Sequence, residues 1–332
     1  METERLGARG TWIERFRRLL DRIDGEILGD PRFGASLAKR ALRLTSNAPE
    51  PFAYEAAWRA LGVYGGALRA SERYAEARAM LFASWAALQS KAEVAKEDEA
   101  ELCGRLAFFF RDVREAEDAK AMAARKVELA VDPKTRAKAL VDSCLVAWDA
   151  GDTDWSRFRE SGLNVLLSLD HHEEPAYYRT ALQMFLVASA EDDEAQNLEL
   201  AVWLKEYCAF EKAPPGSVGF ATRNWVVGLV LRRLGRIEGA RQALNDAQRT
   251  YLGVGNLEHA ATAVMDLAIL ELAQGRNDEV VRLAGKLFPI FGSLRYRNRE
   301  AWSSLTLFCR AALDGSLTLH AAKRYRARFM QT

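Results

Sequence analysis

The sequence lacks a long apolar run, an apolar N-terminal segment and an excess of charge of one sign. No stretch approaches the roughly 20 apolar residues that cross a bilayer, so we expect no contact with a membrane. Residues 1–12 have no apolar core of the kind found in secretion signals, and we therefore expect a cytoplasmic protein. The sequence has 47 Lys and Arg against 46 Asp and Glu. This balance argues against nucleic-acid binding, except indirectly through a partner protein.

Closely spaced cysteines are also missing. The four cysteines are far apart and form no CxxC pair: Cys103, Cys144, Cys208 and Cys309. This spacing predicts reduced thiols in a protein core, with neither a disulfide framework nor a zinc site.

The residues that are abundant favour helices. Ala, Leu, Arg and Glu dominate, whereas runs of Val, Ile and Thr are scarce. A chain of 332 residues exceeds the roughly 250–300 at which one hydrophobic core stops growing. The length therefore favours two domains or an architecture that extends along one axis.

Two interleaved series of turn signals recur about every 40 residues, the mark of a repeat. The first series comprises residues 29–31, 71–72, 112–113, 151–152, 191–193, 235–236, 275–276 and 314–315. The second comprises residues 47–51, 91–97, 132–133, 171–175, 214–216, 253–256 and 292–293. Together they predict a unit of two helices that occurs eight times.

Proline and capping residues agree with these breaks. Seven of the eight prolines fall in them, and Pro289 alone lies inside an expected helix, where it predicts a kink or an early end. Asp152 and Asn256 are suited to cap helix N-termini. Gly235 and Gly275 follow helical runs, where a left-handed residue often ends the helix.

Several segments resemble the tetratricopeptide repeat (TPR) family, in particular bacterial members with a long repeat. Trp58-x-x-Leu61-Gly62 followed by Tyr74-x-x-Ala77 is similar to the TPR pattern, and residues 224–244, 265–291 and 299–312 match it further. The resemblance implies an all-α fold, an α-α superhelix, as one right-handed solenoid of about eight helical hairpins over residues 1–332. The expected hairpins span residues 11–47, 52–91, 97–131, 134–170, 175–212, 218–253, 256–292 and 297–329.

The same resemblance implies a concave groove that binds another protein or a peptide. The groove positions of the family fall on Arg59, Arg105, Phe109, Arg179, Gln183, Arg223 and Arg233. A row of arginines suits an acidic peptide or a C-terminal carboxylate, because guanidinium pairs bidentately with carboxylate. The alternative is that these arginines only solvate the groove. We expect an interaction scaffold or regulatory adaptor, or alternatively a peptide-sensing subunit that controls a separate effector.

Catalytic and cofactor motifs are not found, so we expect no enzyme, cofactor or metal. His171-His172-Glu173-Glu174 joins histidine with carboxylates, but adjacent residues of one loop rarely converge on an ion. Basic residues cluster at both ends, and we interpret them as solvated helix faces or as docking patches. The clusters are Arg15, Arg17, Arg18 and Arg22, and Lys323, Arg324, Arg326 and Arg328.

Overall fold

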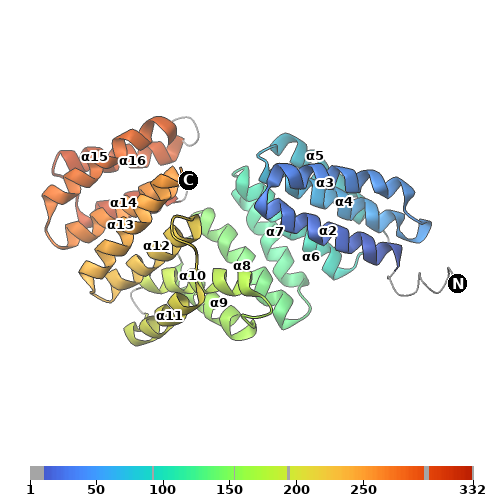
Figure 1. Ribbon diagram of the computed structural model, residues 1–332, viewed down its shortest axis with the longest axis horizontal. Coiled ribbons are helices and arrows are strands. Elements are labelled where there is room, and N and C mark those ends of the chain that lie inside the picture. Colours follow the sequence, from blue (N-terminus) through green and yellow to red (C-terminus); the bar gives the residue numbers. More distant parts are fainter. Residues whose placement is uncertain (1–10, 92, 153, 193–194, 295–298, 331–332) are drawn as a thin grey trace. The chain divides into compact units, whose positions relative to one another are not determined.

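The computed structural model describes residues 11–91, 93–152, 154–192, 195–294 and 299–330. These residues form 16 α-helices and one short 3-10 helix at Thr45–Asn47, without a strand among them (Figure 1). The first eight helices are α2 (Trp12–Gly29), α3 (Pro31–Leu44), α4 (Glu50–Ala70), α5 (Tyr74–Gln89), α6 (Lys96–Asp112), α7 (Ala116–Leu129), α8 (Pro133–Asp149) and α9 (Trp155–Ser168). The others are α10 (Pro175–Glu191), α11 (Asn197–Phe210), α12 (Val218–Arg233), α13 (Ile237–Gly253), α14 (Leu257–Ala273), α15 (Asn277–Leu294), α16 (Arg299–Leu313) and α17 (Leu319–Met330). The all-α prediction is confirmed.

The chain divides into two compact units, which we call unit 1 (Met1–Val146) and unit 2 (Ala147–Thr332). The boundary falls near the C-terminal end of α8.

Left-handed turn residues mark the repeat. Six of them follow the helices α4, α6, α8, α12, α14 and α16: Glu72, Arg114, Gly151, Gly235, Gly275 and Gly315. The last three are spaced by 40 residues. The backbone N–H of the residue after each one bonds back into the preceding helix, as in Arg236 N–H to the Leu231 carbonyl at 2.9 Å. The expected period and the expected roles of Gly235 and Gly275 are therefore confirmed.

Of the two predicted N-cap residues, one is confirmed and one is wrong. Asn256 caps α14, since its side chain accepts from the His259 backbone N–H. The prediction for Asp152 is wrong, because the side chain of Asp154 caps α9 by accepting from the Arg157 N–H. Asp152 instead accepts from the Asp154 backbone N–H at 3.0 Å. The early end expected at Pro289 is also absent, since α15 continues to Leu294.

In unit 1, α2, α4 and α6 contact one another in succession, and α3, α5 and α7 pack beside them. Small residues set the close approach within a hairpin. A Cβ on Gly65 of α4 would lie 2.7 Å from Cγ of Leu81 on α5, a distance that real Cβ atoms do not adopt. Trp58 and Leu68 fill the neighbouring space and are almost completely buried.

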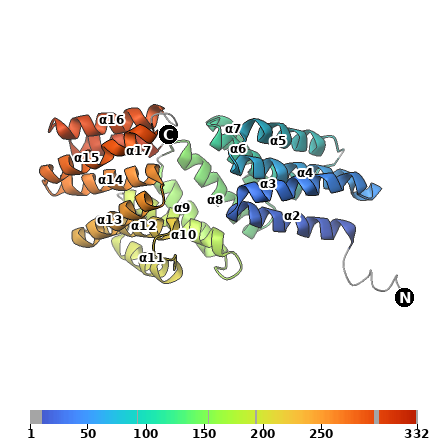
Figure 2. The ribbon, with the colours of Figure 1, turned by 45° about the horizontal axis from the view of Figure 1, so that its top comes forward.

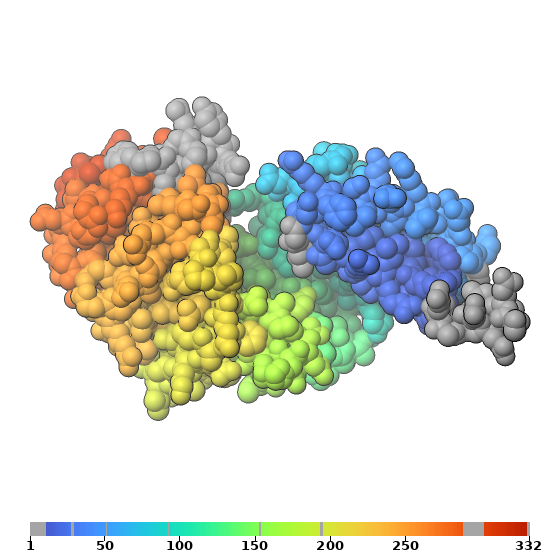
Figure 3. Space-filling view, in the orientation of Figure 1, coloured from blue at the N-terminus to red at the C-terminus, as the bar shows by residue number. Residues whose placement is uncertain are grey.

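In unit 2, α10 contacts α12, and α12 contacts α14, while α9, α11, α13 and α15 pack beside them. In the space-filling view, the yellow and orange parts of unit 2 meet in a continuous surface (Figure 3). Gly228 of α12 repeats the role of Gly65, since its Cβ would lie 2.6 Å from Cγ of Leu244 on α13.

The last hairpin departs from this order. The second helix, α17, packs on α14, and the first helix, α16, packs on α15 (Figure 2). The helices α14, α15, α16 and α17 therefore form a closed ring in which each contacts the next. We call the helices α2, α4 and α6 row A of unit 1 and, separately, the helices α10, α12, α14 and α17 row A of unit 2.

None of the described helices is long and apolar enough to cross a membrane. The cysteines agree with the prediction of reduced thiols, since all four are free, and Cys103, Cys144 and Cys309 are buried. Burial raises the pKa of Cys103 to about 11 and that of Cys309 to about 12, so both are protonated at neutral pH.

Candidate partner-binding face

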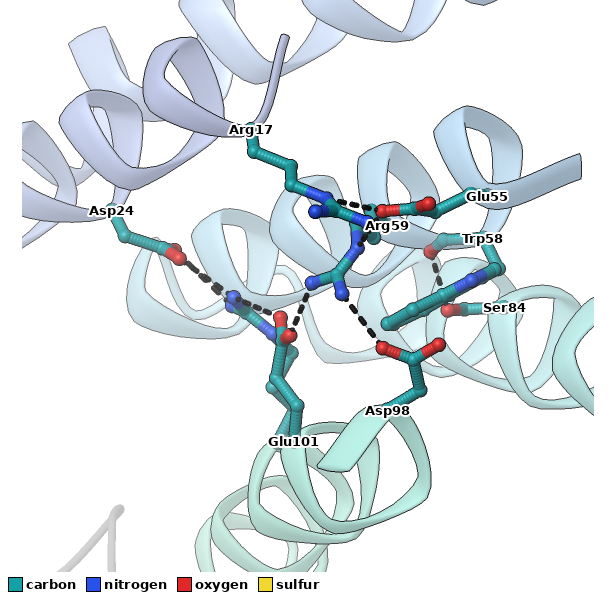
Figure 4. A network of polar contacts seen from close by, with 9 residues as sticks. Arg17, Asp24, Glu55, Trp58, Arg59, Ser84, Asp98 and Glu101 are labelled. Carbon is teal, nitrogen blue, oxygen red and sulfur yellow. Dashed lines mark hydrogen bonds and ion pairs between the residues drawn. The ribbon is translucent and has the colours of Figure 1, made fainter. Parts of the chain in front are cut away.

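Row A of unit 1 carries a connected network of ion pairs centred on Arg59 (Figure 4). The guanidinium of Arg59 lies 2.9 Å from Glu55 of the same helix, 2.7 Å from Asp98 and 2.6 Å from Glu101 of α6. It also lies over the ring of Trp58, 4.5 Å from the ring centroid. All three nitrogens of this guanidinium therefore bond to carboxylates of the protein itself.

Arg105 of α6 is held in the same way. Its Nη2 lies 2.6 Å from Asp24 of α2 and 3.2 Å from Glu101. The helix α4 makes room for it with glycines, since a Cβ on Gly66 would lie 3.2 Å from the Arg105 Nη1. The network thus joins α2, α4 and α6.

The ionisation of this network is set by its neighbours. Burial raises the pKa of Glu55, but the hydrogen bond and charge of Arg17 together with Arg59 outweigh it and hold that pKa below its ordinary value. Burial raises the pKa of Asp98 and is only partly opposed by Arg59. Arg59 and Arg105 are half-buried in these pairs, so unit 1 does not present them as free cations for a partner.

Phe109 does not line a surface. It has no exposed area and packs in the core of unit 1 with Trp58 and Leu102. Its ring makes an edge contact with Phe110 at a centroid distance of 5.6 Å. The expected groove position is therefore wrong for this residue, because the face of α6 that carries Phe109 packs inward.

Row A of unit 2 carries a second, more deeply buried network. Arg232 of α12 lies 2.8 Å from Glu191 of α10 and 3.2 Å from Asp266 of α14. Arg326 of α17 lies 2.6 Å from Asp266 and 3.4 Å from Glu191. The indole N–H of Trp225 donates to Asp266 at 2.9 Å. We call Glu191, Arg232, Asp266 and Arg326 the charge cluster.

Within the charge cluster, Glu191 and Arg326 favour their charged forms despite burial. Burial raises the pKa of Glu191, but Arg326 and Arg232 outweigh it and hold the pKa below its ordinary value. Burial lowers the pKa of Arg326, and Asp266 and Glu191 reverse that effect. Two cations and two carboxylates balance one another in a site of low exposure.

Sequence reasoning missed this cluster. It placed Arg326 with the basic residues of the chain end, as a solvated or docking side chain, and the structure corrects this because only 5% of Arg326 is exposed. One signal was present in the sequence. Asp266 is the only acidic residue in the apolar segment 260–270, and a carboxylate in a buried helix requires a partner.

The other residues predicted to line the groove lie on α10 and α12 of unit 2. Arg179 of α10 pairs at 2.7 Å with Glu211, which is 6% exposed. The amide of Gln183 donates to the hydroxyl of Tyr207 at 3.1 Å. Burial raises the pKa of Tyr207, so its hydroxyl stays protonated. Arg179 is thus committed to Glu211, although half of its side chain is exposed.

Arg223 and Asn224 of α12 differ from the arginines above. Within the described part of the chain, Nε of Arg223 and Nδ2 of Asn224 are buried and find no hydrogen-bond acceptor. Arg223 also makes no ion pair with any described residue. The neighbouring Thr222 is satisfied, since its hydroxyl lies 2.8 Å from that of Tyr251. Buried donors without acceptors are rare, and each such group calls for an explanation.

Arg233 is held at the C-terminal end of α12. Its Nη2 donates to the carbonyl of Ala195 at 3.4 Å. Of the predicted groove residues, the structure therefore brings Arg179, Gln183 and Arg223 to one end of row A in unit 2 and leaves only Arg223 without a partner among the described residues.

Metal binding finds no support in the described residues. They contain no group of three or more His, Cys, Asp or Glu side chains placed to hold an ion. The ring centroids of His171 and His172 lie 3.9 Å apart with the rings tilted by 39°, and His171 contacts Tyr178 and Phe210. The histidine pair thus takes part in an aromatic cluster.

No protein-family model and no curated protein matches the sequence. Among solved structures, the crystal structure of a Rap protein complexed with Competence and Sporulation Factor has a similar fold, with a TM-score of 0.63. The alignment covers 94% of this chain and 85% of the Rap chain at 12% identity. At that identity the similarity concerns the fold alone, and it agrees with the expected helical-repeat architecture.

Proposed function

We propose that the protein is an interaction scaffold or regulatory adaptor that binds another protein or a peptide on row A of unit 2. The observation that carries the proposal is the pair of buried, unsatisfied donors on Arg223 and Asn224. A buried N–H without an acceptor costs free energy, and an acceptor on a bound partner would recover it. The proposal assigns the chain no catalytic role.

A contrast between Arg223 and the arginines of the other ion-pair networks supports this location. In unit 1, Arg59 and Arg105 are bonded to carboxylates of neighbouring helices. In unit 2, the charge cluster is satisfied internally. Arg223 has no such carboxylate partner among the described residues, and a guanidinium binds a carboxylate with charge-assisted bonds.

A regulatory role is the second candidate, in which the bound partner changes the action of a separate effector. The Rap protein with a similar fold was solved in complex with Competence and Sporulation Factor. That fold can hold a separate factor, which favours a sensing role over a purely structural one.

The test compares single substitutions in the same helix row. A partner is first identified by affinity capture with the wild-type chain from its native host. We expect Arg223→Ala and Asn224→Ala each to weaken the binding of that partner by about tenfold to a hundredfold, as expected for loss of a charge-assisted or buried hydrogen bond. Reversal of Arg179 is a poor test, because Arg179→Glu would face the buried Glu211 and disturb the fold.

The matched control is Arg249→Ala. The Arg249 side chain is 74% exposed on α13, outside row A, and its ion pair with Asp246 lies on the surface. This variant should bind as the wild type does. Wild-type affinity of both Arg223→Ala and Asn224→Ala, in folded protein, would remove the proposed site.

A further inference from the structure

We infer that the carboxylates of Glu191 and Asp266 form a binding site for the arginine of a basic amphipathic helix, and that α17 is the chain's own occupant of this site. The inference deepens the proposed function and rests on it, because it places a self-docked segment on the row that a partner would use. The partner segment it fits is a helix that is rich in Lys and Arg.

The charge balance of the site supports this assignment. Without Arg326, the cluster would hold two carboxylates against the single cation of Arg232. A net negative charge would then remain on residues of low exposure, since Asp266 is 0% exposed. A site of this kind demands a cation, and the planar guanidinium is the cation best matched to two carboxylates.

A separate helix, α17, supplies the second cation. Glu191 belongs to α10 and Asp266 to α14, and Arg326 reaches both from α17. Its Nη2 also donates to Oδ2 of Asp266 at 3.2 Å, so the guanidinium engages both oxygens of that carboxylate. One arginine thus bridges two helices of row A from outside them.

The helix α17 is basic and contacts the rest of unit 2 through few buried side chains. Its 12 residues include no acidic residue in the first turn or elsewhere, and its cations are Lys323, Arg324, Arg326 and Arg328. Only Ala322, Arg326 and Phe329 are buried. These three lie at positions i, i+4 and i+7, so one narrow stripe of the helix makes the contact.

The position of α17 in the fold points the same way. It packs on α14 in row A, whereas α16 packs on α15, so the last hairpin is turned relative to the hairpins before it. The short connection between α16 and α17 contains Gly315 in the left-handed conformation. A helix held by three buried side chains is among the segments expected to open locally before the rest of the unit.

The experiment uses the full chain and a fluorescent peptide of residues 317–330 as the probe. The peptide should bind the wild-type chain weakly, because the tethered α17 competes at high effective concentration. It should bind the Arg326→Gln chain at least tenfold more tightly, since that chain has lost the bonds that hold its own helix. A peptide that carries Arg326→Gln should bind neither chain.

Two controls separate a site from a merely structural contact. Arg324→Gln, at an exposed position of α17, should change neither the chain nor the peptide in this assay. A second peptide should keep only Ala322, Arg326 and Phe329 on an unrelated Lys- and Gln-rich helix, and it should bind the Arg326→Gln chain within about fivefold of the native peptide. Hydrogen exchange of the α17 amides shows whether the helix opens in the variant. If the Arg326→Gln chain fails to fold, Phe329→Ser replaces it.

The inference is overturned if α17 exchanges rapidly in the variant and neither peptide binds, or if the peptide with Arg326→Gln binds as well as the native one. Because the assay needs no natural partner, its failure leaves the Arg223 and Asn224 test intact. Conversely, loss of the Arg223 site would not alter peptide binding at the charge cluster.

Discussion

The indole nitrogen of Trp225 lies 2.9 Å from Oδ2 of Asp266, so α12 and α14 share a buried hydrogen bond across 41 residues of sequence. The same carboxylate receives Arg232 and Arg326. One side chain of α14 therefore satisfies donors from α12 and α17, and its removal should be felt throughout unit 2.

Replacement of Asp266 by Ala should destabilise the protein by about 3–5 kcal/mol, since it leaves two buried guanidinium groups without their shared carboxylate. Urea unfolding followed by circular dichroism measures the change. The control is Asp246→Ala on α13, whose ion pair with Arg249 is exposed and should contribute less than about 1 kcal/mol. Equal, small effects of both substitutions would show that the charge cluster does not stabilise unit 2.

Glu191 should make stability depend on pH in the acid range. Its pKa in the folded protein lies below the ordinary value, because Arg326 and Arg232 outweigh burial. The stabilisation is thus fully present above the unfolded-state pKa of about 4.3 and is lost as pH falls through the folded pKa. Glu191→Gln should lower stability at pH 7 and lose less between pH 7 and pH 3 than the wild type. Glu117→Gln, at a side chain that is 91% exposed, should follow the wild-type curve.

Glycine at the helix contacts should not tolerate a methyl group. Gly228→Ala places its Cβ 2.6 Å from Cγ of Leu244, so overpacking should cost about 1–3 kcal/mol in urea unfolding. Gly285→Ala is the matched control, since a Cβ there meets nothing within 4 Å and should stabilise α15 by about 0.5–1 kcal/mol. A neutral Gly228→Ala would contradict the close approach of α12 and α13.

Two turns hold a side chain where glycine stands elsewhere. Glu72 has φ of 60° and Arg114 has φ of 66°, at the places that Gly235 and Gly275 occupy in later hairpins. Glu72→Gly and Arg114→Gly should raise the melting temperature, each by relief of up to about 1 kcal/mol of backbone strain. Gly235→Ala should lower it for the same reason. Stabilisation by the alanine would refute the left-handed assignment.

The thiols should differ sharply in reactivity. Cys208 is half-buried, whereas Cys103, Cys144 and Cys309 are buried. A colorimetric thiol reagent should therefore modify one cysteine quickly in the native protein and four after unfolding. The Cys208→Ser variant should lose the fast phase.

The helix pairs and their turns were predictable because they depend on local chemistry. Glycine at 235 and 275 and the apolar spacing of each helix are visible in the sequence. The left-handed conformation of Glu72 and Arg114 was not predictable, because Glu and Arg rarely adopt a positive φ. The packing of α17 on α14 was also not predictable, because apolar periodicity identifies the buried face of a helix and does not identify the helix that packs against it.

The site was predictable only in part. Arg59 and Arg105 were placed in the correct helices, but their partners Asp98 and Asp24 lie 39 and 81 residues away. Whether an arginine is free or paired depends on the register between neighbouring helices, which one sequence does not reveal. For the same reason, the sequence does not distinguish Arg223, whose buried Nε has no acceptor among the described residues, from the paired arginines.

Helical arrays of this kind are commonly regarded as strings of interchangeable modules that evolution can duplicate or delete. The charge cluster opposes duplication or deletion of single modules in unit 2, because its four members come from the four different helices α10, α12, α14 and α17. Deletion of the 40 residues 236–275 would leave one intact turn at Gly235 and yet discard Asp266. We therefore expect the helices of unit 2 to be inherited together. Gain or loss of a whole hairpin should destabilise the fold less where no buried ion pair connects distant modules.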